Sequence, residues 1–134
     1  MRKDEKILFA RRINTGYQDG MYQMPAGHVD PGELPSEAGV REAKEEIGID
    51  IKPEDMKHVH SCFRRKLNGE SDRADYYFEA MKWSGEITNC EPEKCDDLKW
   101  VDPHALPDNT VAHIRTALEA IDRGAQYSEL RVGQ

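Results

Sequence analysis

The sequence has few cysteines and no long apolar run, and both shortages narrow the class of protein. Its three cysteines are an odd number, which favours free thiols in a reducing compartment over a disulfide framework. No stretch approaches the roughly 20 apolar residues of a membrane-spanning helix, and the first residues lack an apolar segment of signal-peptide length. We therefore expect a cytoplasmic protein without a membrane partner.

Positive charge is also in short supply. Lysine and arginine number 19 against 26 aspartates and glutamates, and the formal net charge is −7. Non-specific binding to a nucleic acid polymer depends on basic surface, so we expect no such partner. A small nucleotide remains possible, because a bound metal ion can neutralise its phosphates locally. The 134 residues suffice for one core, and we expect a single domain over residues 1–134.

The segment Pro35–Ile47 has the pattern of an amphipathic helix. Proline suits the first helical turn, Ser36 is an alternative N-cap, and Gly48 suits the left-handed position after the last turn. Spacing of three and four residues separates an apolar face from an acidic face. The two faces are Val40, Ala43 and Ile47 against Glu42, Glu45 and Glu46.

The acidic face has two interpretations. Charge runs usually mark a solvated surface, which is the simpler one. However, carboxylates three and four residues apart repel one another, and a divalent cation would remove that penalty. Mg²⁺ selects oxygen ligands and commonly bridges to substrate phosphates. Arg41 lies beside this face, and Glu33 is a plausible ion-pair partner that would fix the preceding loop against the helix.

The stretch Gly27–Ile49 resembles the signature of the Nudix hydrolase superfamily, G-x5-E-x7-R-E-U-x-E-E-x-G-U, with U an aliphatic residue. Every fixed position is met, with Ala43 and Ile49 at the two U positions. The resemblance implies an α/β fold: a Nudix-type α/β/α sandwich with a mixed central sheet and two main helices. It also implies a MutT-like pyrophosphohydrolase that uses Mg²⁺, with Mn²⁺ as a substitute, to cleave a phosphoanhydride bond of a nucleoside diphosphate linked to another group X.

The resemblance also implies roles for particular residues. Glu33 and Arg41 are expected to orient the loop and helix behind the metal ligands. The expected ligands are the acidic cluster and one backbone carbonyl: Glu42, Glu45, Glu46 and Ala26.

Several Nudix enzymes place an additional acid in a later loop. Glu91 is our first candidate and Glu93 the second, against the alternative of a solvated acidic loop. We expect Glu42, Glu45 and Glu91 to be catalytic. The general base is left open between Glu42 and Glu91.

Arginine forks match phosphate oxygens, so we expect substrate contacts from arginines near the ends of predicted strands. These are Arg12, Arg64 and Arg65, with Arg11, Tyr17 and His28 as weaker candidates. The alternative for each is an exposed charge or a packed ring.

Members of the superfamily that cleave different substrates differ in particular residues after the signature, and these residues guide the choice of substrate. The region about fifteen residues after the signature holds Arg64, Arg65 and Lys66. It lacks the proline of some ADP-ribose-cleaving members and the tyrosine of some dinucleoside-polyphosphate members. We therefore favour a nucleoside tri- or diphosphate, handled by a monomer or homodimer. Two alternatives remain: a non-catalytic nucleotide-sensing module, or a hydrolase of ADP-ribose or sugar nucleotides.

The remaining elements are predicted from alternation and turn residues. Val59 and Phe63 are the expected core residues of one strand, and Asp75–Trp83 is expected to be a central strand covered on both sides. Asp108 or Asn109 should cap a final helix, and residues 125–134 show no pattern. The predicted strands are Lys6–Ile13, Met21–Met24, Met56–Lys66, Asp75–Trp83 and Leu98–Val101, with an Asn68-Gly69 turn between the third and fourth.

Overall fold

The computed structural model describes residues 1–16, 18–25, 29–66 and 72–132. Within this part of the chain, no helix is long and apolar enough to span a membrane. Several expectations of the preceding section lie outside the described residues: those for Tyr17, Ala26, Gly27, His28 and the Asn68-Gly69 turn.

The described residues form seven strands, two α-helices and one short 3-10 helix. In chain order these are β1 (Arg2–Lys3), β2 (Lys6–Arg12), β3 (Tyr22–Gln23), α1 (Pro35–Ile47), the 3-10 helix (Pro53–Asp55), β4 (Lys57–Lys66), β5 (Arg73–Glu79), β6 (Cys95–Val101), α2 (Ala112–Asp122) and β7 (Tyr127–Val132).

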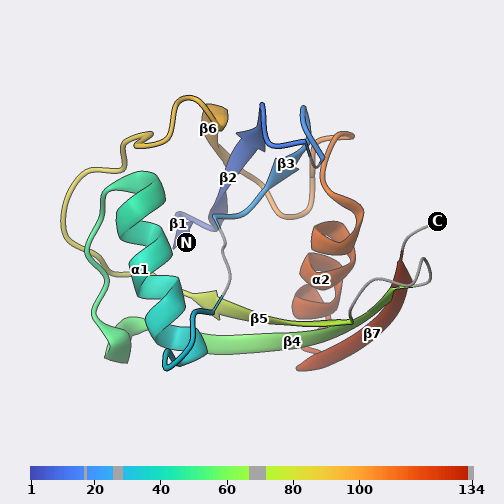
Figure 1. The fold of residues 1–134 in the computed structure, drawn as a ribbon. Coiled ribbons are helices and arrows are strands. Elements are labelled where there is room, and N and C mark those ends of the chain that lie inside the picture. Colours follow the sequence, from blue (N-terminus) through green and yellow to red (C-terminus); the bar gives the residue numbers. More distant parts are fainter. Residues whose placement is uncertain (17, 26–28, 67–71, 133–134) are drawn as a thin grey trace.

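The strands pair in two sheets (Figure 1). In the first, β2 pairs with β1, β3 and β6, always antiparallel. In the second, β4 lies between β5, which is antiparallel to it, and β7, which is parallel. Two main helices and mixed strand pairing confirm the predicted α/β class.

Strand β2 shows how the sandwich is built. Ile7 and Phe9 are buried with residues of α2, whereas Leu8 is buried with residues of α1. Neighbouring side chains of a strand point to opposite faces, so this sheet lies between the two helices (Figure 1). The apolar run Ile7–Phe9 is therefore buried on both faces of the sheet.

Helix α1 has the predicted bounds, with Pro35 in its first turn and Gly48 at φ 73° after its last. Its N-cap differs from the alternative that we considered. Ser36 lies inside the first turn, and Leu34 is the cap residue. A carboxylate oxygen of Glu37 accepts a hydrogen bond from the Leu34 backbone N–H at 2.8 Å, so the side chain at the third helical position satisfies the helix start.

The buried face of β4 was predicted only in part. Val59 is partly buried and packs against the core, as expected. Phe63 is also only partly buried, and the buried positions of the strand are His60, Cys62 and Arg64. An irregularity in the pairing with β5 after His58 shifts the alternation. Polar residues that point inward are invisible to a search for alternating apolar residues.

His60 shows why the inward face tolerates polar groups. Its Nδ1 lies 2.8 Å from the carbonyl oxygen of Ala125, and its Nε2 lies 2.7 Å from Oγ of Ser128. Both ring nitrogens are therefore satisfied, as buried polar groups require. These contacts attach β4 to the segment that ends in β7.

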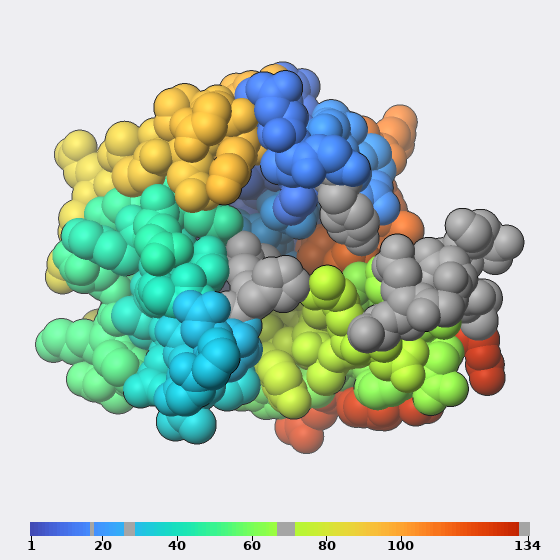
Figure 2. Space-filling view, viewed as in Figure 1, coloured from blue at the N-terminus to red at the C-terminus, as the bar shows by residue number. Residues whose placement is uncertain are grey.

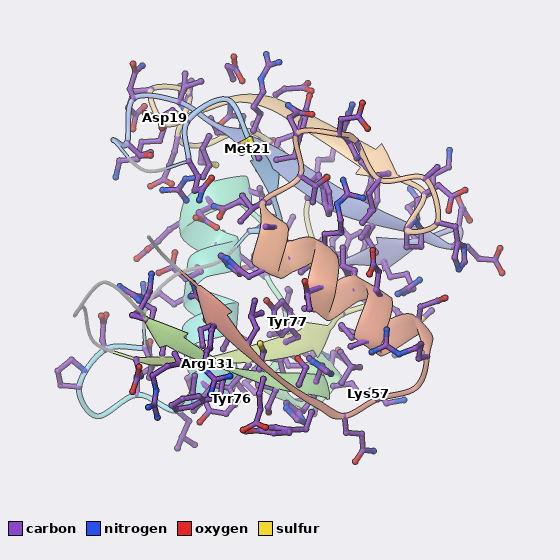
Figure 3. All side chains as sticks on the ribbon, turned by 90° about the vertical axis from the view of Figure 1, so that its right-hand side faces the viewer. Asp19, Met21, Lys57, Tyr76, Tyr77 and Arg131 are labelled. Carbon is purple, nitrogen blue, oxygen red and sulfur yellow. The ribbon has the colours of Figure 1, made fainter. Side chains whose placement is uncertain are left out.

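The central-strand prediction for Asp75–Trp83 is also wrong. The strand β5 pairs with β4 alone in its sheet, so β4 is the central strand. Tyr77 is buried, but Tyr76 is 50% exposed, and Figure 3 shows the two on opposite sides of the sheet. The aromatic residues suggested burial on both faces, whereas one face is open to solvent.

Two predictions at the carboxyl end also differ from the structure. Residues 127–132 form β7 beside β4, although the sequence YSELRV alternates weakly. Helix α2 begins at Ala112 with Val111 as its cap residue, not with Asp108 or Asn109. Asn109 instead donates a hydrogen bond to the carbonyl of Gly20 at 2.9 Å, so its side chain fastens a loop.

Two glycine substitutions should separate backbone strain from crowding. Gly48 and Gly124 have φ of 73° and 78°, where an L-residue costs about 1 kcal/mol or more. A Cβ on Gly48 would lie 3.1 Å from Sγ of Cys90, whereas one on Gly124 would meet nothing within 4 Å. We expect urea unfolding to show a loss of about 1 kcal/mol for Gly124→Ala and a larger loss for Gly48→Ala. Equal losses of stability in the two variants would contradict the crowding of Gly48 by Cys90.

Candidate active site

A cleft of about 1310 Å³ lies between the two helices and the two sheets. Figure 2 looks onto this face, where the surface is hollowed between α1 and the N-terminal strands. Side chains from distant parts of the chain line the cleft: Arg12 of β2, Glu42, Glu45 and Glu46 of α1, Arg64 of β4, Glu91 of the loop before β6, and His113 of α2.

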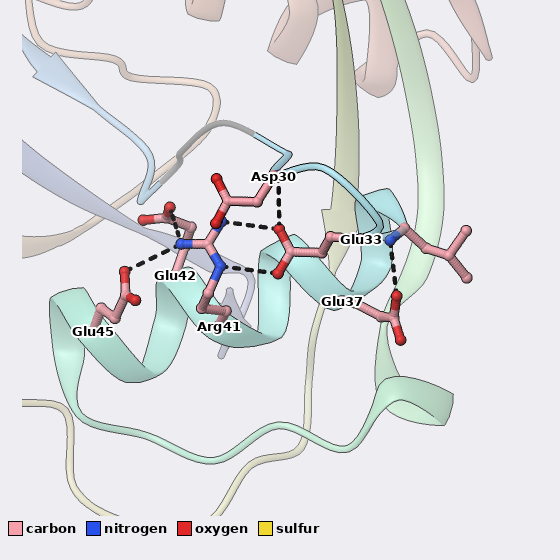
Figure 4. A network of polar contacts seen from close by, with 7 residues as sticks. Asp30, Glu33, Glu37, Arg41, Glu42 and Glu45 are labelled. Carbon is pink, nitrogen blue, oxygen red and sulfur yellow. Dashed lines mark hydrogen bonds and ion pairs between the residues drawn. The ribbon is translucent and has the colours of Figure 1, made fainter.

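Arg41 is the hub of the polar contacts along α1 (Figure 4). Its Nε and Nη2 donate to the two carboxylate oxygens of Glu33 at 2.9 and 3.0 Å. Its Nη1 donates to Glu42 at 2.7 Å and to Glu45 at 3.2 Å. Asp30 lies 3.5 Å from the same guanidinium. The expected pair between Glu33 and Arg41 is therefore formed, and it fastens the loop before α1 to the acidic face.

The surroundings shift the pKa values of Glu33 and Glu42 in opposite directions. Hydrogen bonds from Arg41 hold the pKa of Glu33 below its ordinary value. Burial raises the pKa of Glu42, against the opposing effect of Arg41, and the charges of Glu45 and Glu91 raise it further. Glu42 has a side chain only 16% exposed, whereas that of Glu45 is 53% exposed. Glu42 is thus the deeper group, and its charged form is destabilised.

Glu91 approaches this cluster from another element. The carbonyl of Glu91 accepts hydrogen bonds from the backbone N–H of Lys94 and Cys95 at 2.9 and 3.0 Å, and its own N–H donates to Asn89 at 3.0 Å. The resulting turn places Glu91 along the cleft, whereas Glu93 is absent from its described lining. The structure therefore brings our first candidate, and not the second, next to α1.

The donor set fits a hard divalent cation. Glu42, Glu45 and Glu46 offer only oxygen ligands on one helical face, as Mg²⁺ prefers. Among the described residues, no three acidic, histidine or cysteine side chains are already gathered around one point, and Arg41 contacts oxygens of two of these glutamates. Glu45 is the more exposed of the two, and an exposed ion pair of this kind contributes little to stability. The carbonyl of Ala26 belongs to the undescribed residues.

The three candidate arginines have different positions. Arg12 lines the cleft and donates to Thr15 at 3.1 Å. Arg64 also lines the cleft. Its side chain is only 8% exposed, and two of its nitrogens donate to the carboxylate of Asp75. Arg65 points elsewhere: it is 60% exposed, pairs with Asp72 and is not part of the lining. We therefore leave Arg65 out of the site.

His113 was not found from the sequence. It lines the cleft from the first turns of α2. Burial lowers its pKa to about 4, and the positive charge of Arg64 adds to the effect. A histidine within an apolar helical pattern gives no sign of facing a cleft, because the neighbouring wall is assembled from β4 and β5. No local signal could have identified it.

Comparison with known proteins agrees with this geometry. The family model described as NUDIX domain matches residues 1–121. The chain is 28% identical over 132 residues to the RNA pyrophosphohydrolase of Erythrobacter litoralis (strain HTCC2594), covering 87% of this chain and 80% of that protein. It is 41% identical over 67 residues to the ADP-ribose pyrophosphatase of Methanocaldococcus jannaschii, covering 50% of this chain and 39% of that protein.

A solved structure extends the likeness to the fold. The crystal structure of the MutT NUDIX hydrolase from Burkholderia pseudomallei superimposes with a TM-score of 0.79 at 28% identity, covering 89% of this chain and 90% of that one. Fold and site thus define a hydrolase of the pyrophosphohydrolase class. The chain belongs to the Nudix family.

Replacing Arg41 by lysine should test its orienting role. Lysine keeps the charge but cannot bridge Glu33 and two further carboxylates with one planar group. Loss of a group that orients metal ligands typically costs about 10- to 100-fold in activity or metal affinity. We expect a fall of that size in kcat/KM. Lys44→Ala is the control: Lys44 lies on the same helix and makes only an exposed pair with Asp50, which follows the helix, so this variant should stay near wild type.

The buried His113 should make stability depend on pH. Its folded pKa of about 4 lies below the ordinary 6.5, so the unfolded chain binds the proton more readily between these values. The contribution is complete above about pH 6.5 and is lost as the pH falls through about 4. We expect His113→Gln to lose less stability than wild type between pH 7 and 4 in urea unfolding. Parallel pH profiles would contradict this assignment.

Proposed function

We propose that this Nudix hydrolase is Mg²⁺-dependent and cleaves a phosphoanhydride bond of a nucleoside diphosphate linked to a group X, with nucleoside tri- and diphosphates as the favoured substrates. One observation carries the proposal. The carboxylates of α1 share a single cleft with Glu91 from another element and with Arg12. Phosphoanhydride hydrolysis needs this combination of metal-binding acids, an additional acid and a cation.

Glu42, Glu45 and Glu46 would hold the metal ion, together with the backbone carbonyl of Ala26. A bound Mg²⁺ supplies charge neutralisation at the phosphate oxygens and lowers the pKa of a coordinated water. Arg41 positions two of the glutamates, and Glu33 holds Arg41 in turn. Arg12 would bind phosphate oxygens from the β2 side of the cleft.

The general base is Glu42 or Glu91. In hydrolysis, the oxygen of water bonds to phosphorus, the bridging P–O bond breaks with its electrons on the departing phosphate, and the base takes the water's proton. The pKa of Glu42 is raised by burial and by Glu45 and Glu91, so its carboxylate accepts a proton more readily than an ordinary glutamate. Glu91 remains the alternative because it lines the same cleft.

The preference for free nucleotides over a nucleic acid polymer is supported by the charge of the chain. The net charge of −7 disfavours a polymer held by non-specific charge. The free cysteines support a location in the reducing cytoplasm. The relatives named for RNA and for ADP-ribose define the competing substrates, which belong in any direct comparison.

The test is a substrate panel measured with Mg²⁺, with Mn²⁺ and with chelator. It should contain the tri- and diphosphates of each base, ADP-ribose, sugar nucleotides, dinucleoside polyphosphates and a short 5′-triphosphorylated RNA. We expect metal-dependent release of phosphate or pyrophosphate from nucleoside tri- or diphosphates. Glu45→Gln should reduce kcat/KM by about 100-fold or more, since it removes a metal ligand needed for charge neutralisation.

Glu37→Gln is the matched control. Glu37 lies on the same helix but outside the cleft lining, and glutamine can still accept the hydrogen bond from Leu34. This variant should retain wild-type activity. Turnover of ADP-ribose or sugar nucleotides alone would contradict the favoured substrate, and no metal-dependent turnover by the folded protein would contradict the proposed function.

A further inference from the structure

The loop before β6, residues 88–94, is bonded to the helix that carries the acidic face. The backbone N–H groups of Thr88 and Cys90 donate to the carbonyls of Ile47 and Glu46 at 2.9 and 3.0 Å. These carbonyls belong to the last turn of α1, where the helix itself supplies no partner. The loop therefore caps α1, whose carboxyl end it passes in Figure 1.

The other end of the loop is bonded to the segment after β2. Ile13 donates its backbone N–H to the carbonyl of Lys94 at 2.9 Å, and Asn14 donates its Nδ2 to the carbonyl of Glu93 at 3.3 Å. The next residue, Cys95, begins β6. Both ends of the loop are thus held, so its position relative to α1 and β2 is set by hydrogen bonds.

Asn89 makes a bridge within this loop. Its Nδ2 donates to the carbonyl of Cys95 at 2.7 Å, and its Oδ1 accepts the backbone N–H of Glu91 at 3.0 Å. Asparagine suits this position, because its amide offers both a donor and an acceptor and bonds readily to the backbone two residues further on. One partly buried side chain therefore joins the first residue of β6 to Glu91.

The backbone of Glu91 is held on both sides as a result. Its N–H bonds to Asn89, and its carbonyl accepts from the N–H groups of Lys94 and Cys95. The side chain of Glu91 lines the cleft, and its charge helps to raise the pKa of Glu42. With its backbone held, the carboxylate can move beside the acidic face only by rotation about its own side-chain bonds.

We propose that Asn89 is a positioning residue, which holds the Glu91 carboxylate beside α1 in the geometry that hydrolysis needs. The inference rests on the proposed function and adds to it a residue from outside the cleft. Asn89 is not part of the described cleft lining, so it acts through Glu91 and not on the substrate. A displacement of about 1 Å from the productive geometry can cost about 100-fold in rate.

The test is a double-mutant cycle between Asn89 and Glu91, measured with the nucleotide that wild type cleaves best. Glu91→Gln should lower kcat by about 100-fold, as expected for a lost acid–base group. Asn89→Ala should lower kcat by about tenfold or more, because the carboxylate is no longer held. The two losses should not multiply, so the double variant should be as slow as Glu91→Gln within about twofold. Losses that multiply would overturn the inference, as would an unchanged kcat in Glu91→Gln.

Further measurements separate positioning from a general loosening of the fold. In Asn89→Ala, KM and the affinity for Mn²⁺ should stay close to wild type, because the proposed phosphate and metal contacts come from other elements. Asn89→Asp can still accept the N–H of Glu91 but cannot donate to Cys95, so its kcat should lie between those of wild type and Asn89→Ala. An affinity for Mn²⁺ that falls as much as kcat would overturn the inference, since the substitution would then act through the glutamates of α1.

Thr88→Val is the matched control. The Oγ1 of Thr88 donates to the carbonyl of Glu86 at 3.2 Å, a bond in the same loop that holds neither Glu91 nor Cys95. The variant keeps the backbone N–H that caps α1, so it should retain the wild-type kcat. Circular dichroism establishes that each variant is folded. If wild type cleaves no nucleotide, the proposed function fails; if wild type is active and Asn89→Ala is equally fast, only this inference fails.

Discussion

The bidentate ion pair between Arg41 and Glu33 is the interaction on which the site depends. Three glutamates on one helical face repel one another, and α1 is stable in the structure because one guanidinium lies against Glu33, Glu42 and Glu45. This ion pair also attaches the loop before α1 to the helix. Arg41 contacts two of the expected ligands, Glu42 and Glu45. The same residue thus stabilises the helix and holds its carboxylates in place.

The rest of the fold serves to place other groups opposite this helix. The first sheet carries Arg12 to the cleft, the turn at Glu91 adds an acid from a distant loop, and β4 contributes Arg64. The buried ion pair between Arg64 and Asp75 holds the guanidinium of Arg64 in place.

The sequence predicts the acidic helix well, because its periodicity, the proline of its first turn and the glycine after its last are local and its spacing matches a family signature. It predicts less where pairing is non-local. β7 is held by parallel pairing with β4, which its own residues do not encode. The inward positions of β4 are polar, so they escape a search for apolar alternation. Likewise, His113 reaches the cleft only because α2 packs beside β4 and β7. Arg65 lies outside the cleft because successive residues of a strand point to opposite sides.

Manganese binding, followed by electron paramagnetic resonance in the absence of nucleotide, tests the central claim most directly. The account predicts that the protein binds Mn²⁺, that Mg²⁺ displaces it, and that Glu45→Gln/Glu46→Gln abolishes binding while Glu37→Gln does not. Retained binding in the double variant would contradict the account, because the ion would then be held somewhere other than the acidic face of α1. Absence of binding to wild type would contradict it as well.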